Sequence, residues 1–245
     1  MKQAAESIQG QFLIAPPAQP VADPAIPDYL EKNYWWAYLH PIAVRIFERE
    51  WLVNLILWGN FRRLRDLALA ELGSPIEGKV LQTACVYGNF TQKIAGRLGS
   101  KGSLDVIDIA PIQLTNLRAK LPADSPVRLH CQDASQLHFP EAHFDSVVLF
   151  FLLHEQPEAV RRATLAEALR VTRPGGHIVI VDYHNPQRRN PLRYVMSLVL
   201  RLLEPFASDL WRNDIAAYLP PSPSLSGMVK ETYFGGLYQK VVLTC

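Results

Sequence analysis

The sequence predicts an α/β protein in which helices cover a mostly parallel, seven-stranded sheet. After Pro75, short apolar segments alternate with helical ones, which is typical of a parallel sheet. The chain then closes with two apolar segments joined at Gly235-Gly236, and this pattern predicts an antiparallel hairpin. A length of 245 residues, 49% of them apolar and 20% charged, suits one globular domain with an added helical segment.

The chain divides into a tail and one domain. Residues 1–26 are rich in Ala, Pro and Gln, and we expect a flexible tail there. Residues 27–245 are expected to form the domain: a helical cap (27–75), a central α/β core (76–185), a helical insertion (186–218) and the closing hairpin (226–245).

Charge and cysteine content exclude several classes of protein. A net charge of +2 gives no reason to expect a nucleic-acid partner. The three cysteines are far apart, which supports neither a disulfide framework nor a structural zinc site. Residues 1–10 lack the apolar core of a signal peptide, and no apolar run approaches the roughly 18 residues of a membrane span. We therefore expect a cytoplasmic protein, with peripheral contact at the cytoplasmic face of the inner membrane left open.

The cap is predicted to be helical and unusually aromatic. Residues 29–72 have a helical pattern that Pro41 interrupts, and one apolar helix is predicted over Ala43–Trp58. Four aromatic residues stand within five positions: Tyr34, Trp35, Trp36 and Tyr38. A helix spreads such a run around most of its circumference. The rings either pack the helix onto the domain or form the wall of a pocket for an aromatic or quinone ring.

The core and insertion supply the strands and the remaining helices. Strands are predicted over 80–84, 104–109, 127–131, 146–152, 177–182, 228–234 and 237–244. Helices are predicted over 89–98, 112–121, 158–171, 192–203 and 209–218. The helix over 192–203 has an apolar stripe beside several arginines, and it suits either a lipid interface or packing on the core.

Polar residues follow the first three strands where a nucleotide can bind. The turn after the first strand, within Val80–Thr91, lies at the C-terminal edge of the sheet, where ligands approach backbone N–H groups. Asp108 ends the second strand about 20 residues later, and a carboxylate there can bind both ribose hydroxyls. Asp133 follows the third strand and can accept a hydrogen bond from the adenine amine.

These blocks resemble class I S-adenosylmethionine-dependent methyltransferases over residues 80–183. The family's first motif is acid-x-Gly-x-Gly-x-Gly; here Gln82 takes the acid position, Ala84 and Val86 replace two glycines, and Gly88 remains. No Gly-x-Gly-x-x-Gly is present, which argues against a dehydrogenase. The resemblance implies a Rossmann-like fold that binds S-adenosylmethionine. The residues it implies for cofactor binding are Gln82, Ala84, Tyr87, Gly88, Asp108, Ile109, Asp133 and Ala134.

The altered turn has two interpretations. Ala84 and Val86 add Cβ atoms where glycine would let backbone approach the methionine end of the cofactor, and Tyr87 adds a ring. Gln82 removes a negative charge near the sulfonium. Either the site has decayed and binds nothing, or the cofactor is repositioned and presents a different group to the substrate.

A narrower resemblance favours repositioning. The turn Val86-Tyr87-Gly88-Asn89-Phe90-Thr91, the segment Ile26-Pro27-Asp28-Tyr29-Leu30 and the aromatic cluster resemble RquA, the methyltransferase-like family of rhodoquinone biosynthesis. The resemblance implies that ubiquinone is the substrate and that an amino group replaces a ring methoxy group. It also implies that S-adenosylmethionine donates the amino group and that manganese (Mn²⁺) is the metal.

Polar residues also follow the fourth and fifth strands. His154 follows the fourth strand, and Asp182, Tyr183 and His184 end the fifth, so they should meet at the same edge of the sheet. His154, Asp182 and His184 are candidate manganese ligands. The alternative is a polar lining or an acid–base role, with Tyr38, His154 and Tyr183 as candidate catalytic residues.

Two other functions stay open at this stage. A conventional S-adenosylmethionine-dependent quinone or lipid methyltransferase would keep the same fold. A cofactor-free quinone-binding protein would keep it without turnover, although Asp108 and Asp133 argue against that function.

Overall fold

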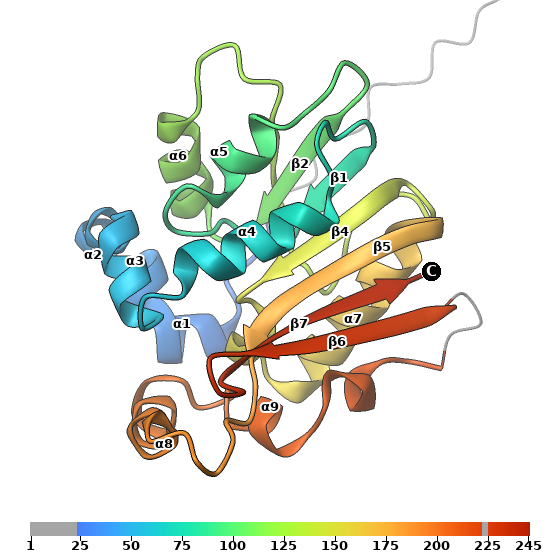
Figure 1. The fold of residues 1–245 in the computed structure, drawn as a ribbon. Helices are drawn as coiled ribbons and strands as arrows, with labels where there is room; N and C mark the ends of the chain where they lie inside the picture. Colours follow the sequence, from blue (N-terminus) through green and yellow to red (C-terminus); the bar gives the residue numbers. More distant parts are fainter. Residues whose placement is uncertain (1–23, 222–224) are drawn as a thin grey trace, which may run out of the picture.

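The computed structural model describes residues 24–221 and 225–245. Its centre is a seven-stranded sheet in the order β3-β2-β1-β4-β5-β7-β6 (Figure 1). The strands are β1 (Lys79–Gln82), β2 (Ser103–Asp108), β3 (Arg128–Cys131), β4 (Phe144–Phe150), β5 (Thr172–Tyr183), β6 (Gly227–Tyr233) and β7 (Tyr238–Thr244). β1 to β5 are parallel, and β7 lies antiparallel between β5 and β6. The predicted fold class is confirmed, including the closing hairpin.

Helices cover both faces of the sheet because its central strands are apolar on both sides. In β4, Val148 and Phe150 belong to one core cluster, while Val147 and Leu149 belong to the other. This alternation follows from the two-residue period of a strand. The first cluster contains residues of α4 (Phe61–Glu71), α5 (Phe90–Ala95), α6 (Pro111–Lys120) and α8 (Leu192–Leu203). The second contains residues of α7 (Glu158–Val171), α9 (Asp209–Arg212) and η3 (Ile215–Tyr218).

The N-terminal cap is made of short helices. They are α1 (Asp28–Tyr34), the π-helical turn η1 (Trp35–Leu39), α2 (Pro41–Phe47) and α3 (Glu50–Ile56). The single helix predicted over Ala43–Trp58 is wrong, since α2 and α3 are separated at Glu48 and Arg49. Arg49 has extended backbone angles, and the Glu48 carboxylate turns to accept the backbone N–H of Gly88.

The helical insertion agrees only in part with its prediction. α8 begins and ends as expected. The single helix predicted over 209–218 is wrong: α9 ends at Arg212, and Asp214 has extended angles and caps the short η3 through the N–H of Ala216.

Residues 1–23, most of the predicted flexible tail, lie outside the described residues. Residues 24–27 have no regular secondary structure before α1 begins. Among the described helices, none combines the length and the apolar character needed to cross a bilayer.

Candidate active site

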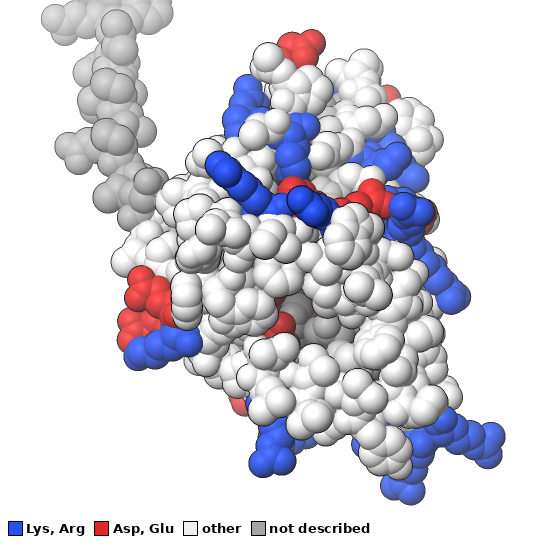
Figure 2. Space-filling view, turned by 90° about the vertical axis from the view of Figure 1, so that its left-hand side faces the viewer, with Lys and Arg blue, Asp and Glu red and all other residues white. Residues whose placement is uncertain are grey.

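A cavity of about 640 Å³ opens beyond the C-terminal ends of the parallel strands. The segments that follow β1, β2, β3 and β4 line one side of it, and the cap and α8 line the other. The space-filling view shows a hollow in a largely uncharged face, with acidic atoms at its bottom (Figure 2). The predicted site residues that line the cavity are Tyr38, Ala84, Tyr87, Asp108, Ile109, Asp133, Ala134, His154 and Tyr183.

Gln82 and Gly88 shape the turn after β1 from outside the cavity wall. Gln82 is fully buried; its side-chain N–H donates to the Ala84 carbonyl (2.7 Å), and its side-chain carbonyl accepts from the Thr91 hydroxyl (3.0 Å). Gly88 has φ +81°, and a Cβ atom there would lie 3.0 Å from the Phe61 ring. Glycine is therefore required for the backbone and for the packing. Neither residue lines the cavity.

Tyr87 joins the turn to the cap. Its hydroxyl donates to the Ala37 carbonyl (2.6 Å) and accepts from the Gln113 side chain (2.8 Å). Its ring stacks on Tyr38, with centroids 5.7 Å apart, and on Phe47. Tyr87, which occupies an unspecified position of the family motif, therefore fixes the aromatic cluster against the cofactor turn.

Two acids at the junction of α2 and α3 strengthen this connection. Glu48 accepts hydrogen bonds from the Gly88 N–H (3.0 Å) and the Asn116 side chain, and it pairs with Lys120. Glu50 accepts from the Asn89 side chain at 2.5 Å. The cap and the turn thus form one connected unit, which sequence reasoning missed. Its signal was a cluster of charged residues, Arg45, Glu48, Arg49 and Glu50, in an otherwise apolar segment.

The acids after β2 and β3 are held by nearby backbone. Asp108 accepts from the N–H groups of Cys85 (2.8 Å) and Ala110 (2.9 Å). Burial raises the pKa of Asp108 to about 6, although these hydrogen bonds oppose the rise. Asp133 accepts from the N–H and the hydroxyl of Ser135, both at 2.8 Å. Both side chains line the cavity where a ribose and an adenine are expected.

Asp105 has a structural role away from the cavity. Its carboxylate pairs with Arg128 (2.5 Å) and His130 (2.7 Å) on the neighbouring strand β3. Burial alone would raise its pKa, but these two partners lower the pKa of Asp105 to about 2. Its separation from Asp108 by three residues in a strand places the two on opposite faces.

His154 is held by a buried carboxylate. It lies in the short η2 (Leu153–Glu155) after β4, and its Nδ1 is 2.9 Å from Asp182. Asp182 is fully buried and also accepts the backbone N–H groups of Leu153 (2.9 Å) and Tyr183 (2.7 Å). Burial opposes a charged imidazole, yet the negative charge of Asp182 prevails and raises the pKa of His154 to about 9.

Two further acids face the same imidazole. His154 Nε2 is 3.7 Å from Glu155 and 4.0 Å from Glu204, the residue directly after α8. Glu155 accepts a short hydrogen bond from the Tyr38 hydroxyl. Burial raises the pKa of both carboxyl groups, and their mutual repulsion raises that of Glu155 further. The cavity wall therefore contains two acids, one imidazole and a phenol, and the buried Asp182 lies behind the imidazole.

Aromatic rings form the wall beside this cluster. Tyr183 meets His154 edge to face, with centroids 4.8 Å apart, and Phe151 packs against both. Phe151 has φ +54°, a left-handed conformation that costs a bulky residue about 1–2 kcal/mol. Such strain is found at functional sites, where the surrounding structure maintains it.

The manganese shell predicted from His154, Asp182 and His184 does not assemble. The His184 ring donates to the Gly236 carbonyl (2.8 Å) in the turn of the hairpin and lies outside the cavity wall. Asp182 uses its oxygens on backbone N–H groups and on His154. Across residues 24–221 and 225–245, no three His, Cys, Asp or Glu side chains are grouped so that they could hold a metal ion. The residues present do not fit the ligand set that we predicted.

Arg161 supports the cluster from behind. This fully buried side chain donates to the carbonyls of Leu153 (2.8 Å), Gln156 (2.9 Å) and Phe206 (3.0 Å). It therefore ties the segment that carries His154 and Glu155 to the segment that follows Glu204. Neither Glu204 nor Arg161 was a candidate from sequence, because no spacing links them to the strand ends.

Comparison with known proteins agrees with this geometry. Residues 80–176 match a family model described as a methyltransferase domain. The ubiquinone/menaquinone biosynthesis C-methyltransferase UbiE of Pseudomonas putida (strain GB-1) is 30% identical over 200 residues, covering 75% of each chain. The demethylmenaquinone methyltransferase of Bacillus licheniformis is 23% identical over 202 residues, which cover 79% of this chain and 86% of the relative.

Solved structures show the same fold. A crystal structure of a SAM-dependent methyltransferase from Aquifex aeolicus has a TM-score of 0.53 and 16% identity, covering 83% of this chain and 97% of that one. The chain belongs to the class I S-adenosylmethionine-dependent methyltransferase family. Within that family it is distantly related to the ubiquinone and menaquinone C-methyltransferases.

Proposed function

We propose that this protein uses S-adenosylmethionine to replace a methoxy group of the ubiquinone ring with an amino group. The observation that carries the proposal is the connection of the altered turn to the aromatic cap through Tyr87, Tyr38 and Ala37. If the site had decayed, no function would require these buried contacts. Their presence supports a turn rebuilt to hold the methionine end in a different position.

Different parts of the cavity wall suit the two substrates. Asp108 and Asp133 suit the ribose and the adenine of S-adenosylmethionine. The aromatic residues Tyr38, Phe151 and Tyr183 suit a quinone ring, and Trp58, Val199 and Leu203 near the mouth suit an apolar tail. The quinone substrates named for the related C-methyltransferases support the same substrate class.

The acid cluster suits the proton transfers of a ring substitution. When the amino nitrogen of S-adenosylmethionine bonds to the ring carbon, that carbon releases its methoxy group as methanol, and the proton lost by nitrogen balances the leaving methoxide. The bond from this nitrogen to the α-carbon must then break. Loss of the α-proton passes two electrons to the quinone ring and leaves a C=N bond, which water hydrolyses to the aminated hydroquinone and a 2-oxo acid. Glu155 with its partner Tyr38 can hold and return the proton lost by nitrogen. Asp182 keeps the imidazole of His154 oriented beside them.

Manganese has no assigned step in this proposal. The resemblance to RquA implies that metal, but His184 lies apart from His154 and Asp182, and no group of three potential ligands is present among the described residues. Every role above is therefore given to side chains.

The second candidate is methyl transfer to a quinone ring carbon. The similarity to quinone C-methyltransferases favours it, because the named relatives are methyltransferases. Both candidates use the same cofactor and the same substrate class, and they differ in the bond that is formed.

Doubly labelled S-adenosylmethionine separates the two candidates. Ubiquinone is incubated with the protein and a cofactor that carries heavy nitrogen in its amino group and deuterium in its methyl group, with and without Mn²⁺. Mass spectrometry of the quinone should show heavy nitrogen and the loss of a methoxy group. Gain of a deuterated methyl group would instead support the second candidate, and an unchanged quinone would contradict both.

A further inference from the structure

One face of the molecule exposes an unusual number of large apolar side chains. Of the exposed large hydrophobic residues among residues 24–221 and 225–245, all but Met228 and Val229 lie on the cap or on α8. Those on the cap are Trp35, Ile42, Ile46, Trp51, Leu55, Ile56 and Trp58. Those on α8 are Tyr194, Val195, Leu198, Leu202 and Leu203. We call these twelve residues the apolar face.

The apolar face surrounds the mouth of the cavity. Leu55, Ile56 and Trp58 from the cap and Leu203 from α8 belong both to this face and to the cavity wall. The two elements meet where the Trp58 ring N–H contacts the Met196 sulfur at 3.1 Å. Figure 2 shows the hollow within a broad uncharged area of this side of the molecule.

α8 is apolar on two sides, and only one side is used by the fold. Met196 and Leu200 are buried in the core, at 2% and 1% exposure. Tyr194, Leu198 and Leu202 point outward and are 75%, 60% and 70% exposed. A helix that only needed to pack on the domain would carry polar residues on that outer side.

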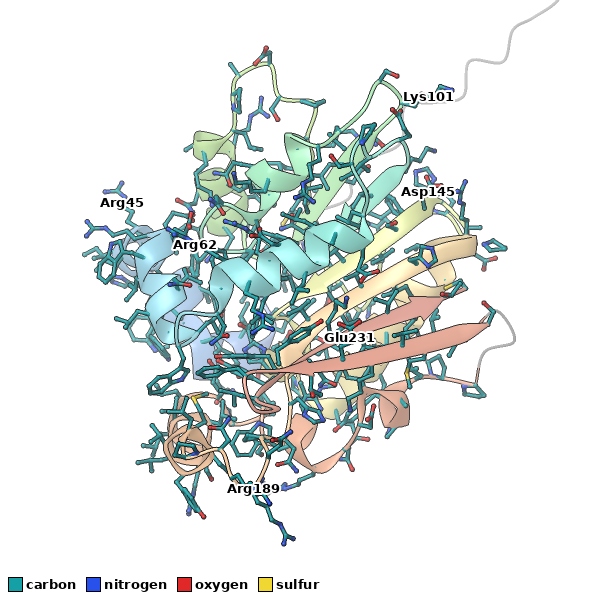
Figure 3. All side chains as sticks on the ribbon, viewed as in Figure 1. Arg45, Arg62, Lys101, Asp145, Arg189 and Glu231 are labelled. Carbon is teal, nitrogen blue, oxygen red and sulfur yellow. The ribbon has the colours of Figure 1, made fainter. Side chains whose placement is uncertain are left out.

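Arginines stand at the two ends of the apolar face. Arg45 and Arg49 are exposed on and after α2, and Arg188 and Arg189 are exposed before α8. Within the described part of the chain none of these four has an ion-pair partner. Figure 3 shows Arg45 and Arg189 extending away from the protein at opposite ends of this side. Figure 2 shows basic side chains above and below the hollow.

We propose that the apolar face docks onto an anionic lipid bilayer and places the mouth of the cavity against the lipid. Exposed tryptophans and leucines enter the interface between headgroups and acyl chains, while flanking arginines bind lipid phosphates. A second copy of this chain is the other occupant that an apolar face could bind, but an isologous contact would bring the same four arginines to the interface again. The charge pattern therefore selects a bilayer.

Docking in this orientation would give a lipophilic ligand a direct path from the bilayer into the cavity. This consequence rests on the proposed function, because it requires a quinone substrate. The docking itself does not, so it is measured without quinone and without S-adenosylmethionine. Failure of one proposal can then be distinguished from failure of the other.

Vesicle co-sedimentation tests the docking. The parent protein is mixed with vesicles of phosphatidylcholine alone or with added phosphatidylglycerol, at low and high salt. We expect binding to the anionic vesicles and weaker binding at high salt, because surface charges are screened. Absence of binding to anionic vesicles would overturn the proposal.

Two variants and two controls locate the contact. Trp51→Ser/Leu198→Ser/Leu202→Ser should weaken binding at least about tenfold through lost apolar burial. Replacing Arg45, Arg49, Arg188 and Arg189 by Gln should weaken it by about fivefold for each arginine that contacts lipid. The apolar control, Met228→Ser/Val229→Ser, changes exposed residues at the opposite edge of the sheet, where β6 pairs with the end of β7. The charge control is Lys101→Gln, far from this face (Figure 3).

The controls should bind like the parent, and circular dichroism should show that every variant is folded. Equal binding by folded apolar-face variants and by the parent would overturn the proposal. So would a stable dimer, seen by analytical ultracentrifugation, that the Leu198/Leu202 change dissociates, because the face would then belong to a second copy.

Discussion

The two halves of the cavity are built in different ways. On the side of β1 to β3, Asp108 and Asp133 accept hydrogen bonds from backbone N–H groups that are only 2 to 23 residues away in the sequence. On the side of β4 and β5, Glu155 is bound by Tyr38, 117 residues away, and His154 lies between Asp182 and Glu204. The first half is local in sequence, and the second is assembled from distant segments.

From this difference we infer that the first half binds the cofactor and that the second half carries out the chemistry. Backbone donors keep the acids of the first half in place whether or not a substrate is present, which suits a cofactor site. The groups of the second half mainly face one another in a buried space, so each changes the protonation of its neighbours. Substitutions in the second half should therefore affect turnover, while those in the first half should affect cofactor affinity.

The largest expected effect is on turnover, from Glu155→Gln. This change keeps the shape of the side chain but removes the proton that Glu155 shares with Tyr38. Loss of a general acid or base lowers rates by about 10²- to 10⁴-fold. Quinone turnover should fall by that factor while calorimetry shows unchanged affinity for S-adenosylmethionine. Glu158→Gln, a surface change at an ion pair with Arg162, is the matched control. Equal loss in both variants would contradict the division of roles.

The next effect concerns the altered turn, which connects the two halves. Gln82→Asp/Ala84→Gly/Val86→Gly restores the family motif but removes the hydrogen bonds from Gln82 to Ala84 and Thr91. We expect the variant to bind S-adenosylmethionine and to lose on the order of 100-fold in quinone amination, because a displacement of about 1 Å has that cost. Product analysis measures the amination, and thermal melting shows whether the variant is folded. Unchanged amination in a folded variant would show that the altered turn has no mechanistic role.

A smaller effect is expected in the first half from Asp108→Ala. Losing hydrogen bonds to a charged group costs about 1.5–3 kcal/mol, which is roughly 10- to 100-fold in affinity for S-adenosylmethionine. Because burial raises the pKa of Asp108 to about 6, affinity of the parent should also weaken as the pH falls below that value. Calorimetry at two pH values measures both effects, with the exposed Asp124→Ala as control. Equal affinity of parent and Asp108→Ala would remove Asp108 from the site.

The same contrast explains what the sequence could predict. Apolar strands and the rule that parallel strands end at one edge were enough to locate Asp108, Asp133, His154 and Tyr183. All four line the cavity. These predictions needed only local pattern and the order of the strands.

The remaining parts depend on packing between distant segments. Glu204 reaches the cavity because the end of α8 lies beside His154 in the segment that follows β4, and no periodicity encodes that contact. His184 was misplaced because β5 pairs with β7 up to Tyr183, so the next residue follows the hairpin and bonds to Leu237 and Gly236. Gln82 occupies a motif position, yet only the structure shows that it holds the turn.

The smallest effect tests the charge of His154 through stability. In the unfolded chain a histidine has a pKa of about 6.5, and in the fold the acids Asp182, Glu155 and Glu204 raise the pKa of His154 to about 9. A raised pKa means that the folded state binds the proton more tightly. The resulting stabilisation is fully present below about pH 6.5 and is lost as the pH rises through about 9. This stabilisation adds at most about 3 kcal/mol to the free energy of unfolding.

Urea denaturation measures the free energy of unfolding of the parent and of His154→Gln. The two values should differ most near pH 6 and converge near pH 9.5. The exposed His138→Gln should show no such convergence, because it lacks these buried acids. A constant difference between parent and His154→Gln across this range would mean that His154 is neutral in the fold, and the second half of the cavity would then lack the charged imidazole that its acids require.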